Sequence, residues 1–389
     1  MLVVSEYLPL RGGTVSQTML HARELDRAGD SPLVLTRPVP GRPRHEEIDG
    51  VPVERVGLAG QGVVAKAAAI AATGWWLWRH RGSVSAANVM LDSDFAAIAR
   101  AAGVRAVTMT WVGSGDAGRC LGGLLRPLRR RLLAGVRHVV LTPTMLAELA
   151  GFGYDATIIP VPVDPQRFQV TDAGSRLLAR QQLGLDDEPV VLFVGHIKHG
   201  KGIDLLLEAC RRLNDTAGPF RVLLVGEPPL RADRAYEDEL RRVASSSELR
   251  GRVHFCGRSD DPRVYYRAAD VFCLPSRREG MPNVLLEAMA SGLPCVAPPS
   301  AGGHDLLMGG LGAVPPSGSP DDLATSIGEL LASPADARSI GLAAASAVRG
   351  EYYSPRRVIA EYQRLWASPG ALRCREPPAS RPAGPSDPG

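Results

Sequence analysis

Lysine is scarce in this chain of 389 residues: only Lys66, Lys198 and Lys201 are lysines among 45 basic residues, and the others are arginines. Such a bias makes each lysine that remains more informative as a candidate functional residue. The net charge of +4 is small, and no basic stretch is interleaved with aromatic residues, which make up 5% of the chain. We therefore expect no nucleic-acid partner.

Paired cysteines are also missing. The six cysteines form no C-x-x-C pair and no metal-binding spacing with histidine. Cys256, Cys273 and Cys295 lie inside short apolar runs, where a free cysteine acts as a small hydrophobic side chain. These features predict a cytoplasmic protein with reduced thiols and no zinc site.

Long apolar runs are absent as well. The longest, residues 67–78, is too short to cross a bilayer, which takes about 20 residues. Residues 1–8 have the pattern of an apolar strand without a basic start, so we do not expect a secretory signal there.

Short apolar strands alternate with helical stretches in the first half of the chain. Residues 2–5 predict a buried strand, and Gly12-Gly13 precedes a helical pattern over residues 16–28. Another strand is predicted at residues 33–36. Strand, glycine loop, helix and strand in this order are typical of the opening of a doubly wound sheet.

A second series of the same kind begins at Val190, after a segment with three prolines at residues 160–165. Its continuous apolar strands alternate with helices, which indicates a parallel sheet covered on both faces. The predicted strands are 190–194, 221–225, 253–256, 270–274 and 294–297, and the predicted helices are 203–213, 234–244 and 284–290.

The whole pattern predicts two Rossmann-like, doubly wound α/β domains that face each other across a deep cleft. Ligands of open α/β sheets bind at the carboxyl ends of the strands, so we expect a small molecule or a nucleotide in this cleft. Six prolines among the last 22 residues predict a disordered tail. The predicted segments are an N-terminal domain at 1–165, a linker at 166–188, a C-terminal domain at 189–350, a helix at 351–367 that returns toward the N-terminal domain, and the tail at 368–389.

The most specific segment is residues 274–294, which lies between two predicted strands. Glu279 falls in the loop after the first of them, and Glu287 falls one turn inside the following helix. Asn283 and Glu287 share a face of that helix, because they are four residues apart. Backbone N–H groups at the start of the helix would point toward a phosphate or a sugar hydroxyl. They belong to Met281, Asn283 and Val284.

This segment resembles the Glu-x7-Glu signature of the family 4 retaining glycosyltransferases, known as glycosyl transferases group 1, which have the GT-B fold. The match runs from Pro275-Ser276 through Glu279 and Glu287 to Pro294. The resemblance implies that Glu279 orients the donor sugar during catalysis and that Glu287 holds the ribose of a nucleotide-diphosphate sugar. The alternative is that two surface glutamates flank an ordinary helix. This alternative would explain an isolated Glu-x7-Glu spacing, but not the match over the whole of residues 275–294.

Residues 190–203 resemble the strand and loop in which this family holds the donor diphosphate. Lys201 matches the family's lysine, and its ammonium group would also serve the reaction by stabilising the leaving diphosphate. His196 stands where the family has an arginine, so a single imidazole replaces a fork of donors. Lys198 and Arg258 are alternative sources of the missing charge. Arg258 also matches a position whose backbone meets the nucleobase.

Two loops of the N-terminal half complete the resemblance. Gly12-Gly13 resembles the glycine loop near the donor phosphates and the acceptor. Residues 110–119 resemble a glycine-rich loop of some members, which makes Asp116 a candidate for contact with the transferring sugar or the acceptor. The alternative is an aspartate that only turns the chain. Residues 300–305 resemble a loop that ends in glutamate in most members of the family. In this chain an aspartate, Asp305, stands one position before the place of that glutamate.

Aromatic and basic residues gather in the N-terminal half. Trp75, Trp76 and Trp78 lead into three basic residues, and residues 119–137 hold six arginines and no acidic residue. Aromatics beside cations suit a membrane surface, and many relatives use lipid-linked acceptors. We expect peripheral contact at the inner face of the cytoplasmic membrane. The alternative is a core-facing aromatic stripe and a solvated basic helix.

The resemblance implies a metal-independent, retaining hexosyltransferase. It would transfer a sugar from a nucleotide-diphosphate sugar to a saccharide, lipid-linked or small-molecule acceptor in polysaccharide, glycolipid or other glycoconjugate biosynthesis. The N-terminal domain would bind the acceptor and the C-terminal domain the donor. No cofactor and no metal are expected, because the family generally lacks a D-x-D motif. The alternatives are a catalytically silent nucleotide-sugar-binding protein and an epimerase or phosphorylase of the same fold.

Overall fold

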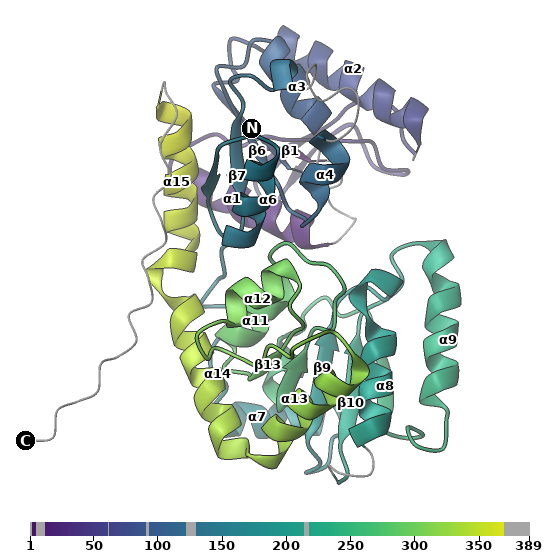
Figure 1. Ribbon diagram of the computed structural model, residues 1–389. Helices are drawn as coiled ribbons and strands as arrows, with labels where there is room; N and C mark the ends of the chain where they lie inside the picture. The colour runs from purple at the N-terminus through teal and green to yellow at the C-terminus, as the bar shows by residue number, and fades with distance from the viewer. Residues whose placement is uncertain are drawn as a thin grey trace, which may run out of the picture.

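The computed structural model describes residues 2–4, 12–60, 62–90, 93–121, 130–213 and 218–368. These residues form two sheets, one in each half of the chain (Figure 1). The first has the strand order β3-β4-β2-β1-β5-β6-β7-β8 and the second β11-β10-β9-β12-β13. All neighbouring strands are parallel except β3 and β4. The prediction of two doubly wound α/β domains is confirmed.

The N-terminal domain is a sheet with helices on both faces. The crossovers through α1 and α2 run in opposite directions along the sheet, so right-handed connections put these helices on opposite faces. Its strands are β1 (Leu2–Val4), β2 (Val34–Thr36), β3 (His45–Ile48), β4 (Val51–Arg55), β5 (Ala86–Met90), β6 (Ala106–Thr110), β7 (Arg137–Val140) and β8 (Ala156–Ile158). Its helices are α1 (Gly13–Arg27), α2 (Val63–Arg79), α3 (Ser93–Ala101), α4 (Asp116–Leu121) and α6 (Pro143–Gly151).

The hairpin of β3 and β4 is absent from the sequence prediction. Its turn is Asp49-Gly50, with φ of 52° and 79°, and an Asp-Gly pair with positive φ suits a two-residue hairpin turn. β3 is half-exposed and carries two glutamates, so it lacks the apolar signal that marks the other strands.

The second domain repeats the plan with a smaller sheet. All five residues of β9 (Val190–Val194) are buried, which agrees with a central strand covered on both faces. The predicted bounds of β9, α8 (Ile203–Leu213), β10 (Arg221–Val225) and α9 (Arg234–Ala244) are confirmed. The other elements are β11 (Val253–Gly257), α10 (Arg263–Ala268), β12 (Val271–Cys273), α11 (Asn283–Ala290), β13 (Cys295–Val296), α12 (Ala301–Leu307), α13 (Pro320–Ala332), α14 (Pro334–Arg349) and three short 3-10 turns at His199–Lys201, Arg231–Asp233 and Glu351–Tyr353.

Residues 166–188, predicted as a linker, contain a helix, α7 (Ala173–Gln182), which packs against α10. Asp172 caps α7, because its Oδ1 accepts a hydrogen bond from Ser175 N at 2.9 Å. The segment therefore belongs structurally to the second domain over much of its length. The helix is polar, with a low density of apolar residues, which explains why the sequence reading took it for a connection.

The last helix, α15 (Pro355–Ala367), returns to the first domain and lies against α1 and β6 (Figure 1). Ile359 joins a core cluster with residues of β1, α1, β2 and β4. The Tyr362 hydroxyl lies 2.9 Å from Thr110 Oγ1, and Trp366 Nε1 donates to Thr108 Oγ1 at 3.2 Å. The chain thus crosses between the domains twice. The predicted tail lies outside the described residues beyond Ser368.

Candidate active site

Loops at the carboxyl ends of β9 and β12 bring the motif residues together. His196 follows β9, Lys201 lies in the 3-10 turn after it, and Glu279 lies in the loop between β12 and α11. Because β9 and β12 are adjacent and parallel, their carboxyl ends meet at one edge of the sheet, where ligands of open α/β sheets bind.

Lys201 and Glu279 form an ion pair between Nζ and Oε1, with side chains that are only 18% and 13% exposed. Two further contacts fix the loops that carry them: Arg277 N donates to Gly200 O at 3.0 Å, and a Cβ at Gly202 would collide with Pro275 O. The charges are therefore held in place before any ligand binds. A charge-assisted pair of this kind can exchange one partner for an incoming phosphate or hydroxyl.

The N-terminus of α11 faces the first domain. No side chain of α11 caps its N-terminus, and the first N–H groups of a helix have no acceptor within the helix. Asn283 Nδ2 donates to Gly13 O at 3.0 Å, and its Oδ1 accepts from Gln17 Nε2 at 3.0 Å. This helix end thus combines a partial positive charge with direct contact to the glycine loop.

The glycine loop lies against two predicted site residues. A Cβ at Gly12 would lie 3.7 Å from His196 Cε1, and a Cβ at Gly13 would lie 3.7 Å from Asn283 Nδ2. Residues from the two domains that are about 180 to 270 positions apart in sequence are therefore neighbours. The structure brings Gly12, Gly13, His196 and Asn283 together.

Glu287 lies one turn inside α11 and is partly buried. Its Oε2 accepts a hydrogen bond from the Tyr266 hydroxyl at 2.9 Å. Burial raises the pKa of Glu287 to about 7, against the lowering effects of the Tyr266 hydrogen bond and of the positive charge of Arg167. The surroundings of this carboxyl therefore oppose its negative charge more than water does.

Met281 and Val284 flank the helix start. Met281 is buried, and its Sδ accepts from Val161 N at 3.1 Å, so its side chain packs into the connection between the domains. The backbone oxygen of Val284 accepts from the Tyr266 hydroxyl at 3.3 Å. The Val284 side chain is partly buried and packs against the core, so a ligand would meet the N–H groups of both residues rather than their side chains.

Asp116 begins α4, in a loop that touches the motif loop of the other domain. Arg278 donates from Nη2 to Ser114 O at 2.8 Å, and a Cβ at Gly280 would collide with Val112 O. Asp116 therefore lies two residues from a contact with the Glu279 loop. Arg258, by contrast, is exposed and pairs with Glu227 at 3.6 Å and Asp260 at 3.2 Å.

Three residues of the site were not predicted from the sequence: Gln17, Tyr266 and Arg278. Gln17 could have been found, because it lies one helical turn after Gly13 and so faces the same way. Arg278 lies beside Glu279, but its partner is 164 positions away in the sequence, and no local pattern indicates it.

Asp305 makes a second contact between the domains. Its Oδ2 accepts from Thr144 N at 3.1 Å, and its Oδ1 accepts from Thr144 Oγ1 at 2.8 Å. Thr144 is in the first turn of α6, so a carboxylate of α12 satisfies an N–H group of a helix in the other domain. This contact accounts for an aspartate that the sequence left without a role.

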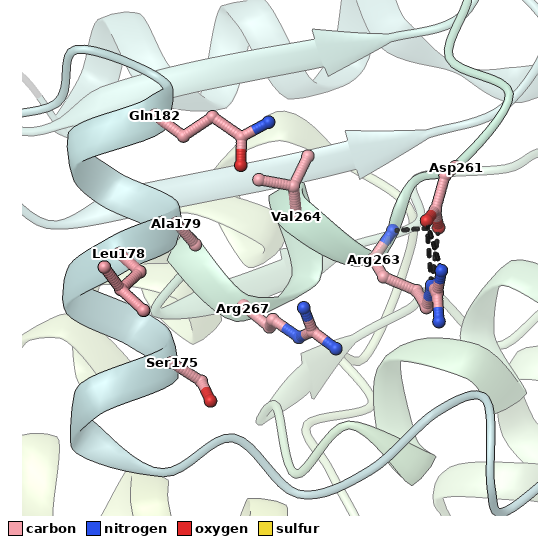
Figure 2. A pocket seen from close by; sticks show the side chains of 8 residues that line it. All are labelled: Ser175, Leu178, Ala179, Gln182, Asp261, Arg263, Val264 and Arg267. Atoms are coloured by element: carbon pink, nitrogen blue, oxygen red, sulfur yellow. Dashed lines mark hydrogen bonds and ion pairs between the residues drawn. The ribbon is translucent and has the colours of Figure 1, made fainter.

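A groove of about 390 Å³ lies elsewhere on the second domain, between α7 and α10 (Figure 2). Figure 2 shows the Arg263 side chain turned toward Asp261, and the ion pair between them measures 2.5 Å. None of the predicted site residues lines this groove.

The described part of the chain offers neither a metal-binding cluster nor a membrane-spanning helix. It contains no cluster of three or more His, Cys, Asp or Glu side chains that could hold a metal ion. None of the helices in it has both the length and the apolar character needed to cross a membrane.

Comparisons with known proteins show which family and which solved structures this chain is similar to. Residues 188–333 match the family described as glycosyl transferases group 1. The chain is 30% identical over 268 residues to the GDP-mannose-dependent alpha-(1-6)-phosphatidylinositol monomannoside mannosyltransferase of Mycolicibacterium smegmatis, covering 63% of this chain and 66% of that protein. Across the first curated relatives, the match spans between 33% and 66% of their length.

Solved structures extend the likeness to nearly the whole chain. Sucrose-phosphate synthase from Thermosynechococcus elongatus has a TM-score of 0.77 at 22% identity, covering 94% of this chain and 98% of that one. Alr3699/HepE from Anabaena, in complex with UDP and glucose, has a TM-score of 0.72 at 18% identity, covering 94% and 99%. The predicted fold is confirmed, and the family match lies within the predicted donor domain, at residues 188–333. The chain carries a glycosyl transferases group 1 domain and has the GT-B fold.

Proposed function

We propose that this protein is a retaining glycosyltransferase that moves a sugar from a nucleotide-diphosphate sugar to an acceptor hydroxyl. The observation that carries the proposal is the Lys201–Glu279 pair at the sheet edge, beside the N-terminus of α11. A cation and a helix N-terminus suit a diphosphate, and a carboxylate next to them suits a sugar hydroxyl. The first domain would supply the acceptor site.

The reaction needs stabilisation of the leaving group more than it needs a nucleophile. The bond between the anomeric carbon and the diphosphate oxygen breaks, and the acceptor oxygen attacks from the same face. The acceptor proton passes to the departing diphosphate. Lys201 and the N–H groups of Asn283 and Val284 would stabilise the diphosphate charge, which is electrostatic catalysis by groups already in place. Glu279 would orient the donor sugar.

Glu287 would hold the ribose, and the Gly12-Gly13 loop would pack over the phosphates. His196 faces this loop and would donate one hydrogen bond to the diphosphate where the family has arginine. The backbone at Arg258 would meet the base. Asp116 would contact the transferring sugar or the acceptor.

The relatives do not determine which nucleobase the donor of this protein carries. One of them is GDP-mannose-dependent by name, and a structure of the same fold holds UDP and glucose. We therefore propose a nucleoside-diphosphate sugar as donor, without choosing the base, and a glycan or glycolipid hydroxyl as acceptor. We further propose metal-independent catalysis in the cytoplasm, with peripheral contact at the inner face of the cytoplasmic membrane.

A thermal-shift screen with UDP, GDP, ADP and dTDP sugars tests the donor site. A ligand at 100 times its dissociation constant stabilises the folded state by about 2.7 kcal/mol, which is a shift of about 5 to 10 °C at this domain size. We expect such a shift with one nucleotide and its loss in Glu287→Ala. Glu329→Ala, at an exposed position of α13, is the matched control and should keep the shift.

The same donor then serves to test the chemistry. Nuclear magnetic resonance of the product should show the anomeric configuration of the donor, and a chelator should leave the rate unchanged. A shift without turnover would favour the silent binding protein. No shift with any of the four nucleotides would contradict the donor site itself.

A further inference from the structure

Helix α2 turns several of its large apolar side chains to solvent. Its buried residues are Ala65, Ala69, Thr73 and Leu77, whereas the side chains that it turns to solvent include two tryptophans. Most surface helices of globular proteins show the reverse pattern, with the large apolar residues facing the core. The exposed large residues are Val63 at 85%, Val64 at 77%, Trp75 at 61% and Trp78 at 57%.

These exposed residues form one continuous ridge. Positions 63, 67, 71, 75 and 78 recur every three or four residues, so they share one face of the helix. From Val63 to Trp78 the ridge is about 22 Å long at 1.5 Å per residue. We call this surface the α2 ridge; its members are Val63, Val64, Ala67, Ala71, Trp75 and Trp78, all of them exposed.

The packing of α2 prevents it from turning the ridge inward. A Cβ at Gly74 would lie 2.8 Å from Ile98 Cγ1 of α3, so the two helices touch closely at this glycine. At the other end, a Cβ at Gly57 would lie 2.7 Å from Ala69 Cα. The alternative of a core-facing aromatic stripe is therefore wrong for Trp75 and Trp78, which stay outside.

Cations accompany the exposed indoles. The guanidinium carbon of Arg79 lies 5.9 Å from the centre of the Trp75 ring, and that of Arg81 lies 5.1 Å from the Trp78 ring. Residues 63–81 include no aspartate and no glutamate. Indoles favour the boundary between headgroups and acyl chains, and arginines beside them favour anionic headgroups.

We propose that the α2 ridge docks the protein onto an anionic lipid bilayer, with Trp75 and Trp78 at the headgroup boundary and Arg79 and Arg81 on the lipid phosphates. The lipid, rather than a second copy of the chain, is the occupant that the charge favours. Two copies joined through this ridge would bring Arg79 and Arg81 of both copies together, and residues 63–81 hold no acidic residue to balance them.

The position of the ridge suits this role. Figure 1 shows α2 on the side of the N-terminal domain that faces away from the second domain. Docking through α2 therefore leaves the second domain free to bind donor from the cytoplasm. Docking would bring a lipid-linked acceptor near the first domain. This benefit, but not the docking, rests on the proposed function. The docking itself needs no catalysis and is measured without it.

Flotation of the full chain with lipid vesicles tests the inference. We expect binding to equimolar phosphatidylcholine and phosphatidylglycerol, weaker binding to phosphatidylcholine alone, and a loss of binding at high salt. Trp75→Ala/Trp78→Ala should bind the anionic vesicles roughly tenfold or more weakly, because two large apolar groups no longer leave water. Leu177→Ala/Leu178→Ala is the matched control, at residues 59% and 68% exposed on α7, and should bind as the wild type does.

A charge variant separates the electrostatic contribution to vesicle binding from the apolar contribution. Arg79→Gln/Arg81→Gln should lose the preference for anionic vesicles and keep the residual binding to neutral ones. All the substituted side chains are exposed, so we expect unchanged melting temperatures. Absence of wild-type binding, or an equal loss in the α7 control, would overturn the proposal.

Sedimentation velocity tests whether a second copy of the chain, rather than lipid, occupies the α2 ridge. If Trp75→Ala/Trp78→Ala converts a dimer to a monomer and leaves vesicle binding unchanged, the ridge is a contact between copies and the proposal is wrong. The thermal shift with nucleotide sugars is a separate measurement. Its failure in the wild type would remove the proposed function and leave the vesicle result standing.

Discussion

Glu287 lies in surroundings that oppose its charge. Burial raises the pKa of this carboxyl to about 7, while the Tyr266 hydroxyl and the charge of Arg167 lower it. Tyr266 is itself fully buried and donates to both Glu287 Oε2 and Val284 O. It therefore holds the carboxyl group in one orientation and favours the ionised form. We infer that Tyr266 is a positioning residue for ribose binding.

Tyr266→Phe tests this role. A ribose diol donates to a carboxylate, so donor affinity should rise with pH through about 7 in the wild type, as the pKa of Glu287 implies. Without the hydroxyl the pKa of Glu287 rises, and the midpoint moves to higher pH. Near neutral pH we expect donor binding to weaken by roughly up to tenfold per unit of displacement. Calorimetric dissociation constants across pH check the shift.

Tyr265→Phe is the control for the loss of a hydroxyl on the same helix. It should leave the midpoint where it is. A Tyr266→Phe profile that coincides with the wild type would show that the tyrosine only fills space.

The sequence predicts this site in part, and particular residues show why. Lys201, Glu279 and Asn283 lie in motif loops at strand ends, and the parallel sheet brings such loops together wherever the chain runs. Tyr266 has no local signal that links it to Glu287, because the two residues are 21 positions apart and lie on different helices. Gln17 and Arg278 make their contacts across the domain boundary, which no local spacing encodes.

At the scale of elements, predictability follows the apolar pattern. β9 and α8 have strong patterns, a buried run and an amphipathic helix, and their predicted bounds agree with the structure. β3 is half-exposed and acidic, so it has no strand signal. The direction of the α2 tryptophans could not be predicted, because small alanines fill the inner face and apolar residues occur all round.

The contact between α12 and α6 gives a prediction at this scale. Asp305 caps α6 from the other domain, and removing a cap costs about 1 kcal/mol. Asp305→Ala should therefore lower the melting temperature by about 2 to 4 °C. The Thr144 amide should also exchange its hydrogen faster.

Asp305→Asn keeps an acceptor oxygen and should lose less stability. Ser319→Ala removes a cap within one domain, where Ser319 Oγ accepts from Asp322 N at 3.2 Å. It should cost a similar amount without any effect on Thr144 exchange. Equal exchange at Thr144 in Asp305→Ala and the wild type would contradict a cap in solution.

At the scale of the whole molecule, the two domains are joined across the candidate site by side chains of both. Asn283 bonds to Gln17 and to Gly13 O, and Arg278 bonds to Ser114 O. Asn283 is one of the residues expected to meet the donor. The donor is expected to meet the backbone N–H of Asn283, whereas the side chain of Asn283 makes these contacts, so we infer that the contacts loosen locally when a donor binds beside them.

Loosening this junction should speed donor entry. Gln17→Ala removes one hydrogen bond between the domains, worth about 0.5 to 1.5 kcal/mol, and leaves the donor-facing residues of the second domain intact. We expect the association rate of the donor to rise by roughly two- to tenfold, because fewer contacts must break before binding. Stopped-flow binding measures the rate. Gln363→Ala is the matched control, because Gln363 Nε2 of α15 donates to Asp30 Oδ2, just after α1, at 2.7 Å. Its association rate should stay at the wild-type value. An unchanged rate in Gln17→Ala would mean that the donor binds without separating Gln17 from Asn283.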